Sequence, residues 1–222
     1  MVVGRRKQEE YNLSMKNNKC KICRRLGVKL FLKGEKCLSP NCPIIKKPYP
    51  PGLRRKKRSR PLSEYGKELK EKQKLRNWYG LREAQFRKYV KQALEKRGKT
   101  DSVGLLIKTL ESRLDNVIFR LGLSSSRSQA KQLISHSHFL VNGSEINIPS
   151  YQVKLGDTIT IRPQKLKKGA FQNISFKLKK YQPPSWLEFS LKTLEGKVVA
   201  EPGIEEVAPP AEIPAIFEYY SR

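Results

Sequence analysis

Four cysteines lie close together near the start of the chain, in the pattern C-x2-C, thirteen intervening residues, then C-x4-C. Four thiolates in two close pairs can close a tetrahedral Zn2+ site, and such a site stabilises a segment too short to fold around its own core. We therefore predict a structural zinc site without an open position for catalysis. Its ligands would be Cys20, Cys23, Cys37 and Cys42.

Two other interpretations of the cysteines stay open, because spacing alone does not select the metal. The four could hold an iron–sulfur cluster, or they could be uncoordinated thiols. Neighbouring cations would offset the charge of the thiolates and lower their pKa values. These cations are Lys19, Lys21, Arg24, Arg25 and Lys36.

The charge of the chain predicts a polyanionic partner. It has 222 residues, with 47 Lys and Arg against 20 Asp and Glu, and a formal net charge of +27. Nucleic acid is the partner we expect, with salt-dependent binding. A membrane surface would attract the same charge, but no apolar run approaches the roughly 20 residues that span a bilayer. The first residues lack the apolar stretch of a signal peptide, which predicts a cytoplasmic location.

A strip between residues 45 and 61 carries cations, prolines and no acidic residue. We interpret it as an extended arm that contacts RNA phosphates, with a solvated linker as the alternative. Its basic residues are Lys46, Lys47, Arg54, Arg55, Lys56, Lys57, Arg58 and Arg60.

Two helices should follow, separated at Gly80. The first begins near Ser63, and the second places its apolar residues, among them Phe86 and Val90, at i, i+3 and i+4 spacing up to about residue 97. The aromatic side chains belong to these apolar stripes, so we expect them in a core. The basic residues are the RNA candidates: Lys72, Lys74 and Arg76 on the first helix, and Arg82, Arg87 and Lys91 on the second.

Residues 113–162 predict a small module of two helices on a sheet. An apolar stripe, Leu110, Leu114, Val117, Ile118 and Leu121, ends at Gly122, and Ser124 to Ser126 can cap the next helix. That helix should bury Ala130, Leu133 and Ile134 and turn Arg127, Lys131 and Gln132 to the opposite face. Asn142-Gly143 then predicts a type I′ hairpin, and DTITIR a half-buried strand.

This module resembles the small RNA-binding fold shared by ribosomal protein S-four, some pseudouridine synthases, a small heat-shock protein and tyrosyl-tRNA synthetases. In the ribosomal family Lys131 is usually arginine and Ser137 usually glycine. The resemblance implies RNA contacts by the helix faces and the hairpin. The residues concerned are Arg113, Arg120, Arg127, Lys131, His136, His138 and Asn142; for the two histidines, a place in the core is the alternative.

Longer motifs extend the resemblance over nearly the whole chain. LSEYGKELKEKQKLRNWYGLREAQFRKY, PPSWLEFSLKTLEGKVVAEP and the closing FEYYSR are similar to segments of the bacterial ribosomal protein S-four family, in its metal-bearing four-cysteine branch. The resemblance implies a non-enzymatic protein of the small ribosomal subunit that binds the 5′ domain of its ribosomal RNA and nucleates assembly. It also implies a place beside the messenger RNA entry channel and small-subunit proteins three and five, with a role in translational accuracy.

The fold class expected is α+β and mostly helical. We predict an extension and zinc knuckle at 1–45, a basic strip and helical domain at 46–101, an inserted α/β RNA-binding module at 102–174, and a C-terminal segment at 175–222 that packs back on the helical domain. Residues 201–222 hold five glutamates against Arg222, so this tail should avoid RNA. It could bind a basic neighbouring protein or fold on its own basic domain.

Two other functions draw some support from parts of the sequence. Arg113-Leu114-Asp115 matches the R-L-D sequence of pseudouridine synthases, which would make the chain an RNA-modifying enzyme, but no separate catalytic domain of sufficient length remains. Asp115 can instead pair with an arginine or cap a turn. A zinc-dependent DNA-binding regulator would need a two-fold interface or a recognition helix, and neither is evident in the sequence.

Overall fold

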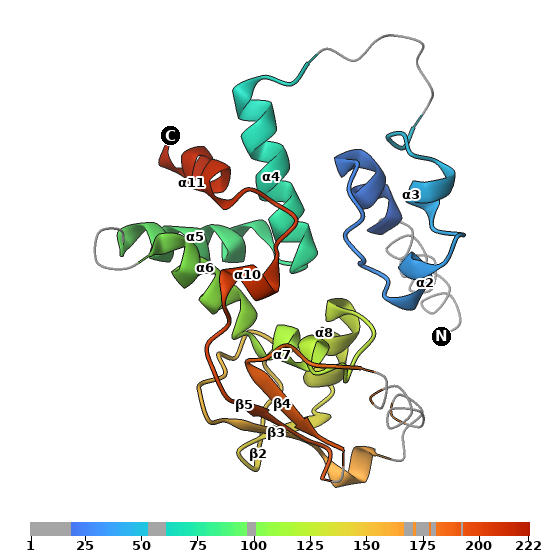
Figure 1. Cartoon of the computed structure of the whole chain (residues 1–222), viewed down its shortest axis with the longest axis vertical. Coiled ribbons are helices and arrows are strands. Elements are labelled where there is room, and N and C mark those ends of the chain that lie inside the picture. Colours follow the sequence, from blue (N-terminus) through green and yellow to red (C-terminus); the bar gives the residue numbers. More distant parts are fainter. Residues whose placement is uncertain are drawn as a thin grey trace, which may run out of the picture. The chain divides into compact units, whose positions relative to one another are not determined.

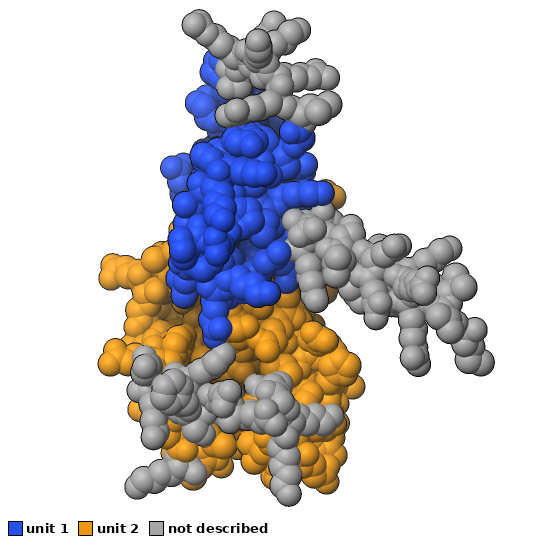
Figure 2. Space-filling view, turned by 90° about the vertical axis from the view of Figure 1, so that its right-hand side faces the viewer, with its two compact units in different colours: residues 1–78, 210–222 blue, residues 79–209 orange. Residues whose placement is uncertain are grey.

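The computed structural model describes residues 19–52, 61–96, 101–166, 171, 178, 181–191 and 193–222. The chain forms two compact units, coloured separately in Figure 2. Unit 1 comprises residues 1–78 and 210–222, and unit 2 comprises residues 79–209. The predicted boundary between residues 101 and 102 therefore falls inside unit 2. The basic residues at 54–58 and 60 lie outside the described part of the chain.

The cysteine lobe, residues 19–52 of unit 1, is built from short helices. Residues 19–26 are helical, and α2 (Glu35–Leu38) and α3 (Pro43–Lys46) follow. Its small core contains Cys23, Leu26 and Leu30, all of them buried. A core of this size covers little apolar surface, as expected for a segment that relies on another source of stability.

The rest of unit 1 pairs α4 (Glu64–Trp78) with α11 (Ile213–Ser221), two segments far apart in the sequence that lie near each other in Figure 1. Ile213 and Ile216 of α11 are buried. Arg222 forms an ion pair of 2.6 Å with the buried Glu68 of α4. The C-terminal helix thus folds on a basic helix of its own unit, which is one of the two alternatives the sequence left open.

Unit 2 begins with a helical pair, α5 (Glu83–Glu95) and α6 (Ser102–Glu111), which pack on each other. Phe86, Val90 and Ala93 form the buried face of α5, as their spacing predicts. Gly80 precedes the pair with φ +62°, a left-handed conformation that suits glycine at a helix break. At α6, the Asp101 carboxylate accepts hydrogen bonds from the backbone N–H groups of residues 103 and 104 and caps the helix.

Two helices at the predicted positions cover the sheet of unit 2: α7 (Leu114–Arg120) and α8 (Arg127–Ser135) (Figure 1). Gly122 has φ +76° and closes α7, and the Ser126 hydroxyl accepts from the Gln129 N–H at the start of α8. Both predictions are confirmed. The apolar stripe is divided, however: Leu110 lies on α6 and the other four residues follow the break at Ser112 and Arg113.

The sheet of unit 2 has five antiparallel strands in the order β2-β1-β3-β5-β4. They are β1 (Phe139–Val141), β2 (Ser144–Glu145), β3 (Thr158–Ile161), β4 (Leu187–Ser190) and β5 (Glu195–Val198). Asn142 and Gly143 join β1 to β2 with φ values of +51° and +78°, the signs that the predicted type I′ turn requires. A short 3-10 helix, η1 (Pro163–Lys165), follows β3.

A single apolar core joins α7 and α8 to this sheet. Leu121, Phe139 and Ile159 are fully buried in it, and Trp186 nearly so. Gly196 of β5 is needed here, because a Cβ at this position would lie 2.5 Å from a methyl carbon of Leu121. A further short helix, α10 (Ile204–Val207), lies beyond β5. Among the described helices, none has the length and apolar content of a membrane span.

Candidate nucleic-acid interface

Arg113 is buried and does not face solvent. Its guanidinium donates two hydrogen bonds to the Asp115 carboxylate, Nε to Oδ1 at 3.0 Å and Nη2 to Oδ2 at 2.7 Å. A third goes from Nη1 to the Tyr89 hydroxyl at 2.7 Å. Both charged side chains are at most 3% exposed. The protein's own contacts therefore occupy Arg113, and we do not include it in the proposed RNA interface.

Asp115 is equally enclosed, which bears on the pseudouridine synthase alternative. A catalytic aspartate must reach the substrate, but this carboxylate is 1% exposed and held by Arg113. Lys131 lies 3.5 Å from the same carboxylate. Asp115 thus acts as the arginine partner that the sequence also allowed.

A buried carboxylate that sequence reasoning missed, Glu111, ends α6. It accepts hydrogen bonds from the Tyr79 hydroxyl (2.6 Å), the Asn116 amide (2.7 Å) and the Arg120 guanidinium (3.0 and 3.2 Å). Burial, and then the neighbouring charge of Glu111, raise the pKa of Tyr79, so its phenol stays protonated and donates. A buried charge is tolerated when its partners satisfy it, as here.

Arg127 corrects a sequence prediction. We expected it on the polar face of α8, but it is only 9% exposed. Its Nε donates to the Asn116 side-chain oxygen at 2.8 Å, and its guanidinium carbon lies 4.9 Å and 4.6 Å from the ring centroids of Tyr79 and Phe119. Two aromatic rings can offset the cost of burying a guanidinium through cation–π attraction. Helical periodicity alone could not reveal these partners.

Several other candidates make contacts within the protein. Lys131 donates to the backbone oxygens of Tyr79 and Gly80, and burial lowers its pKa.

Lys72 is 4% exposed, with its ammonium 4.3 Å from the ring centroid of Tyr219. Lys74 forms an ion pair with Glu71, and Arg76 donates to the side chain of Asn77. Part of the basic surface expected from the sequence is therefore engaged internally.

The two histidines have different environments. His136 is exposed at the end of α8. His138 is 6% exposed and lies 5.5 Å from the ring centroid of Phe171. Asn142 is exposed on the hairpin, but its side chain bonds to Asp157 and to Thr158 of the adjoining strand. His136 remains the histidine that can reach an external phosphate.

The accessible candidates lie on α5 and at its start. Arg82 and Arg87 are exposed, as are Lys88 and Lys91 of the same helix. Opposite them, the buried stripe of Phe86, Val90 and Ala93 faces the protein. Lys88 was missed as a candidate, although the amphipathic period of α5 already places it on the polar face.

The cysteine lobe adds a second cluster of positive charge. Residues 19–52 hold nine Lys or Arg residues and one acid, Glu35. Lys21, Arg25 and Lys36 are exposed, whereas Arg24 donates from Nε to the backbone oxygens of residues 47 and 49. The lobe therefore offers an accessible cationic surface of its own.

The four cysteines line one small cavity of about 10 Å3. Burial raises the pKa of Cys23, opposed by a hydrogen bond from the Leu30 backbone, and burial also raises the pKa of Cys37, whose sulfur accepts from the Lys33 N–H at 3.3 Å. In the described ranges, no group of three or more His, Cys, Asp or Glu side chains has an arrangement that could hold a metal ion. The donor set of four thiols around one cavity suits Zn2+.

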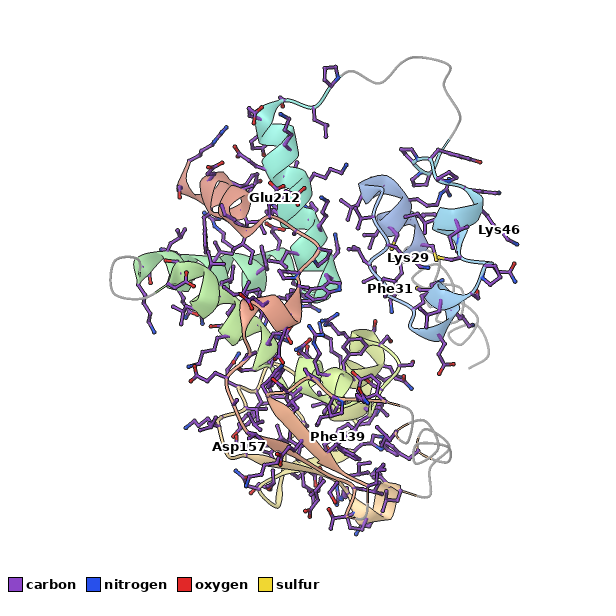
Figure 3. All side chains as sticks on the ribbon, in the orientation of Figure 1. Lys29, Phe31, Lys46, Phe139, Asp157 and Glu212 are labelled. Carbon is purple, nitrogen blue, oxygen red and sulfur yellow. The ribbon has the colours of Figure 1, made fainter. Side chains whose placement is uncertain are left out.

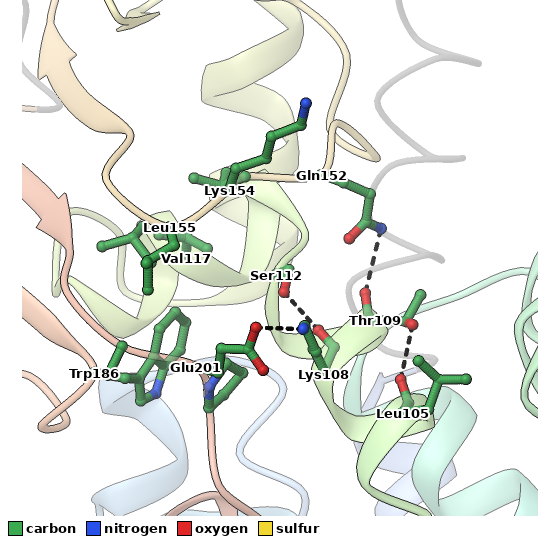
Figure 4. Close-up of a pocket in the computed structure, with 14 residues that line it drawn as sticks. Leu105, Lys108, Thr109, Ser112, Val117, Gln152, Lys154, Leu155, Trp186 and Glu201 are labelled. Atoms are coloured by element: carbon green, nitrogen blue, oxygen red, sulfur yellow. Dashed lines mark hydrogen bonds and ion pairs between the residues drawn. The ribbon is translucent and has the colours of Figure 1, made fainter. Parts of the chain in front are cut away.

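A larger cavity of about 330 Å3 lies in unit 2 (Figure 4). Its lining combines apolar side chains such as Leu155 and Trp186 with an ion pair between Lys108 and Glu201. Among the described residues that line it, Glu201 is the one carboxylate, and neither histidine nor cysteine is present. This lining therefore has no pair of carboxylates and no histidine beside a nucleophile, the groupings typical of hydrolytic sites.

Comparison with known proteins identifies the family of the chain. Residues 14–111 match the model of the ribosomal protein S4/S9 N-terminal domain, and residues 112–159 match the S4 domain. The chain is 45% identical to small ribosomal subunit protein uS4 of Caldicellulosiruptor saccharolyticus over 203 residues, which is 91% of this chain and 96% of that protein. It is 44% identical to uS4 of Halothermothrix orenii and 45% identical to uS4A of Clostridium novyi over the same shares. This chain belongs to the uS4 family of small ribosomal subunit proteins.

Proposed function

We propose that the protein is a structural, non-catalytic constituent of the small ribosomal subunit in the bacterial cytoplasm, and that it binds ribosomal RNA. The observation that carries this proposal is 45% identity to a named small-subunit protein across 91% of the chain. The net charge of +27 and the exposed cations of α5 and of the cysteine lobe agree with an RNA partner.

The binding mechanism we infer is neutralisation of phosphates where RNA helices converge. Arg82 and Arg87, with Lys88 and Lys91, present charge from a helix whose other face is fixed in a core. Buried contacts hold α6, α7 and α8 in one arrangement: Glu111 bonds to Asn116, and Asp115 pairs with Lys131 of α8. A rigid basic surface loses less conformational entropy on binding than a flexible one. Its target would be the 5′ domain of the small-subunit RNA, where such binding nucleates assembly.

The assignment is tested by following the chain in bacterial cells. A tagged copy should co-sediment with small subunits and whole ribosomes, and it should stay with the subunit after a moderate salt wash. Recovery of the chain only in the ribosome-free fraction, while other small-subunit proteins sediment normally, would contradict the proposal.

A finer proposal concerns the messenger RNA entry channel, beside small-subunit proteins three and five. The candidates Arg54, Arg55, Lys57, Arg58 and Arg60 lie outside the described residues, and their support is the uninterrupted charge of the strip. Reversing these charges should slow translation of structured messages more than of unstructured ones and reduce accuracy. If both message classes and assembly were unaffected, this role would be excluded.

We also propose that Cys20, Cys23, Cys37 and Cys42 bind one structural Zn2+. The proposal is supported by their spacing and by the cavity they share. The purified chain should contain about one zinc per molecule, and chelation should lower its melting temperature. A visible absorption band with bound iron would instead indicate an iron–sulfur cluster, and a metal-free chain of unchanged stability would indicate simple thiols.

A further inference from the structure

Phe31 is an exposed aromatic residue on the loop that connects the helical residues 19–26 to α2, labelled together with Lys29 in Figure 3. Its side chain is 44% exposed. The other large exposed aromatic side chains in the described part of the chain are Tyr65 and Tyr181. Their hydroxyls bond within the protein, to the Tyr219 hydroxyl and to the Arg120 backbone oxygen respectively. A phenylalanine has no such group, so exposure of its ring has no polar explanation.

The backbone at Phe31 is strained. Its φ of +52° is in the left-handed region, which an aromatic L-residue rarely adopts. Such strain persists where the surrounding structure enforces it, and it is concentrated at functional sites. Here the loop is held on both sides: Leu30 is 1% exposed and its backbone bonds to Cys23, while the Lys33 N–H bonds to the Cys37 sulfur at 3.3 Å. The lobe thus fixes the position of an exposed ring at a cost in stability.

The surroundings of the ring are cationic. The Lys29 ammonium lies 5.1 Å from the ring centroid, within the range of cation–π attraction. Lys33 follows on the same loop and Lys36 on α2, with Glu35 as the one acid of residues 19–52. An aromatic face flanked by cations is the arrangement by which proteins hold unpaired nucleotides, since the ring stacks on a base and the cations meet the phosphates.

We propose that Phe31 is a stacking platform for an unpaired nucleobase of the bound RNA, with Lys29 close to the phosphate of that nucleotide. The inference rests on the proposed RNA-binding function and adds a specific contact to it. A protein partner that covers Phe31 is the competing occupant, and the excess of positive charge around the ring favours RNA.

The test compares variants of the full chain in binding to two RNAs, the 5′ domain of small-subunit ribosomal RNA and a short unstructured adenine-rich oligonucleotide. Phe31→Gly removes the ring and relieves the positive φ, so it should leave the melting temperature unchanged or raise it. Affinity for both RNAs should nevertheless fall by about 5- to 100-fold, the range for loss of one stacked base. Phe31→Tyr should restore binding and Phe31→Leu should not.

Two controls separate stacking from other causes. Leu38→Ala removes a 71% exposed apolar side chain from the same lobe and should not change affinity. The ratio of affinities between the wild-type chain and Phe31→Gly should be similar at low and high salt, because stacking releases no counterions.

The outcomes distinguish this inference from the function beneath it. If the wild-type chain prefers the ribosomal RNA and Phe31→Gly binds equally well, the stacking role is wrong while the proposed function stands. If the wild-type chain shows no preference over an unrelated structured RNA, the proposed function fails, and the oligonucleotide comparison still decides the role of Phe31. Unchanged RNA affinity with poor incorporation into subunits would assign Phe31 to a protein partner instead.

Discussion

Charged residues of this chain divide into those that stabilise the fold and those that remain accessible to a partner. Arg113, Arg127 and Glu111 are buried, and each forms hydrogen bonds to side chains within the protein. Arg87 and Lys91 are exposed on α5. A basic composition therefore overstates the RNA-binding surface, because part of the positive charge neutralises buried carboxylates within the protein.

The Glu111 cluster yields a stability prediction. Glu111→Gln keeps the size of the side chain but removes its charge, and with it the ion pair to the Arg120 guanidinium. We expect the free energy of unfolding to fall by about 3 kcal/mol, as for other broken buried pairs. Urea denaturation of the isolated chain measures this change.

The matched control is Glu145→Gln, which disrupts the more exposed ion pair of 2.6 Å with Arg162. It should cost less than about 1 kcal/mol. Equal losses in the two variants would mean that burial of Glu111 does not determine the strength of its contacts.

A second prediction concerns Ser137, which follows α8 with φ +55°. Its N–H donates to Ile134 and that of His138 donates to Leu133, the pair of bonds that closes a helix with a left-handed residue. Glycine adopts this conformation without strain, so Ser137→Gly should raise the free energy of unfolding by about 0.5–1 kcal/mol. A thermal melt would show the gain.

Ser135→Gly provides the comparison, because Ser135 is the last residue of α8 itself. There the added backbone freedom should destabilise by about 0.5 kcal/mol. If glycine lowered stability at both positions, strain at Ser137 would not be the controlling effect.

At the scale of elements, the helix α5 separates its two roles by face. Its buried stripe packs within unit 2, so substitutions on the opposite face should not affect folding. Arg87→Ala combined with Lys91→Ala should weaken binding to the ribosomal RNA about tenfold or more. The dependence of log affinity on log salt should become shallower by about one for each phosphate that the variant no longer neutralises.

Lys154→Ala combined with Lys197→Ala removes the same charge from exposed positions elsewhere in unit 2. This control should change affinity by less than the α5 variant. Equal effects on affinity and salt dependence would indicate a diffuse electrostatic attraction without a defined interface on α5.

Elements with local signals were predictable from the sequence. Gly122, Ser126 and the Asn142-Gly143 turn each act on neighbouring residues, and the structure confirms them. The division of the apolar stripe between α6 and α7 was missed because helical period continues across the break at Ser112 and Arg113. The partners of Arg127 and Glu111 come from residues distant in sequence, such as Tyr79, which a single sequence does not reveal.

At the scale of the whole molecule, family membership and charge agree on an RNA-binding protein. The two units each contain a part of the accessible positive charge, one in the cysteine lobe and one on α5. Residues 210–222 belong to unit 1 although they end the chain, and α11 covers part of α4. The fold accounts for part of the acidic C-terminal charge, because Glu201 pairs with Lys108 and Glu206 accepts a hydrogen bond from the Ser185 N–H.

The most direct test of the central claim is salt-dependent binding of the full chain to the 5′ domain of small-subunit ribosomal RNA, with an unrelated structured RNA of equal length as competitor. We predict tight binding that persists in the presence of the competitor and weakens steeply with salt. Equal affinity for the two RNAs would mean that the protein binds RNA only through nonspecific charge attraction, which would contradict the assignment.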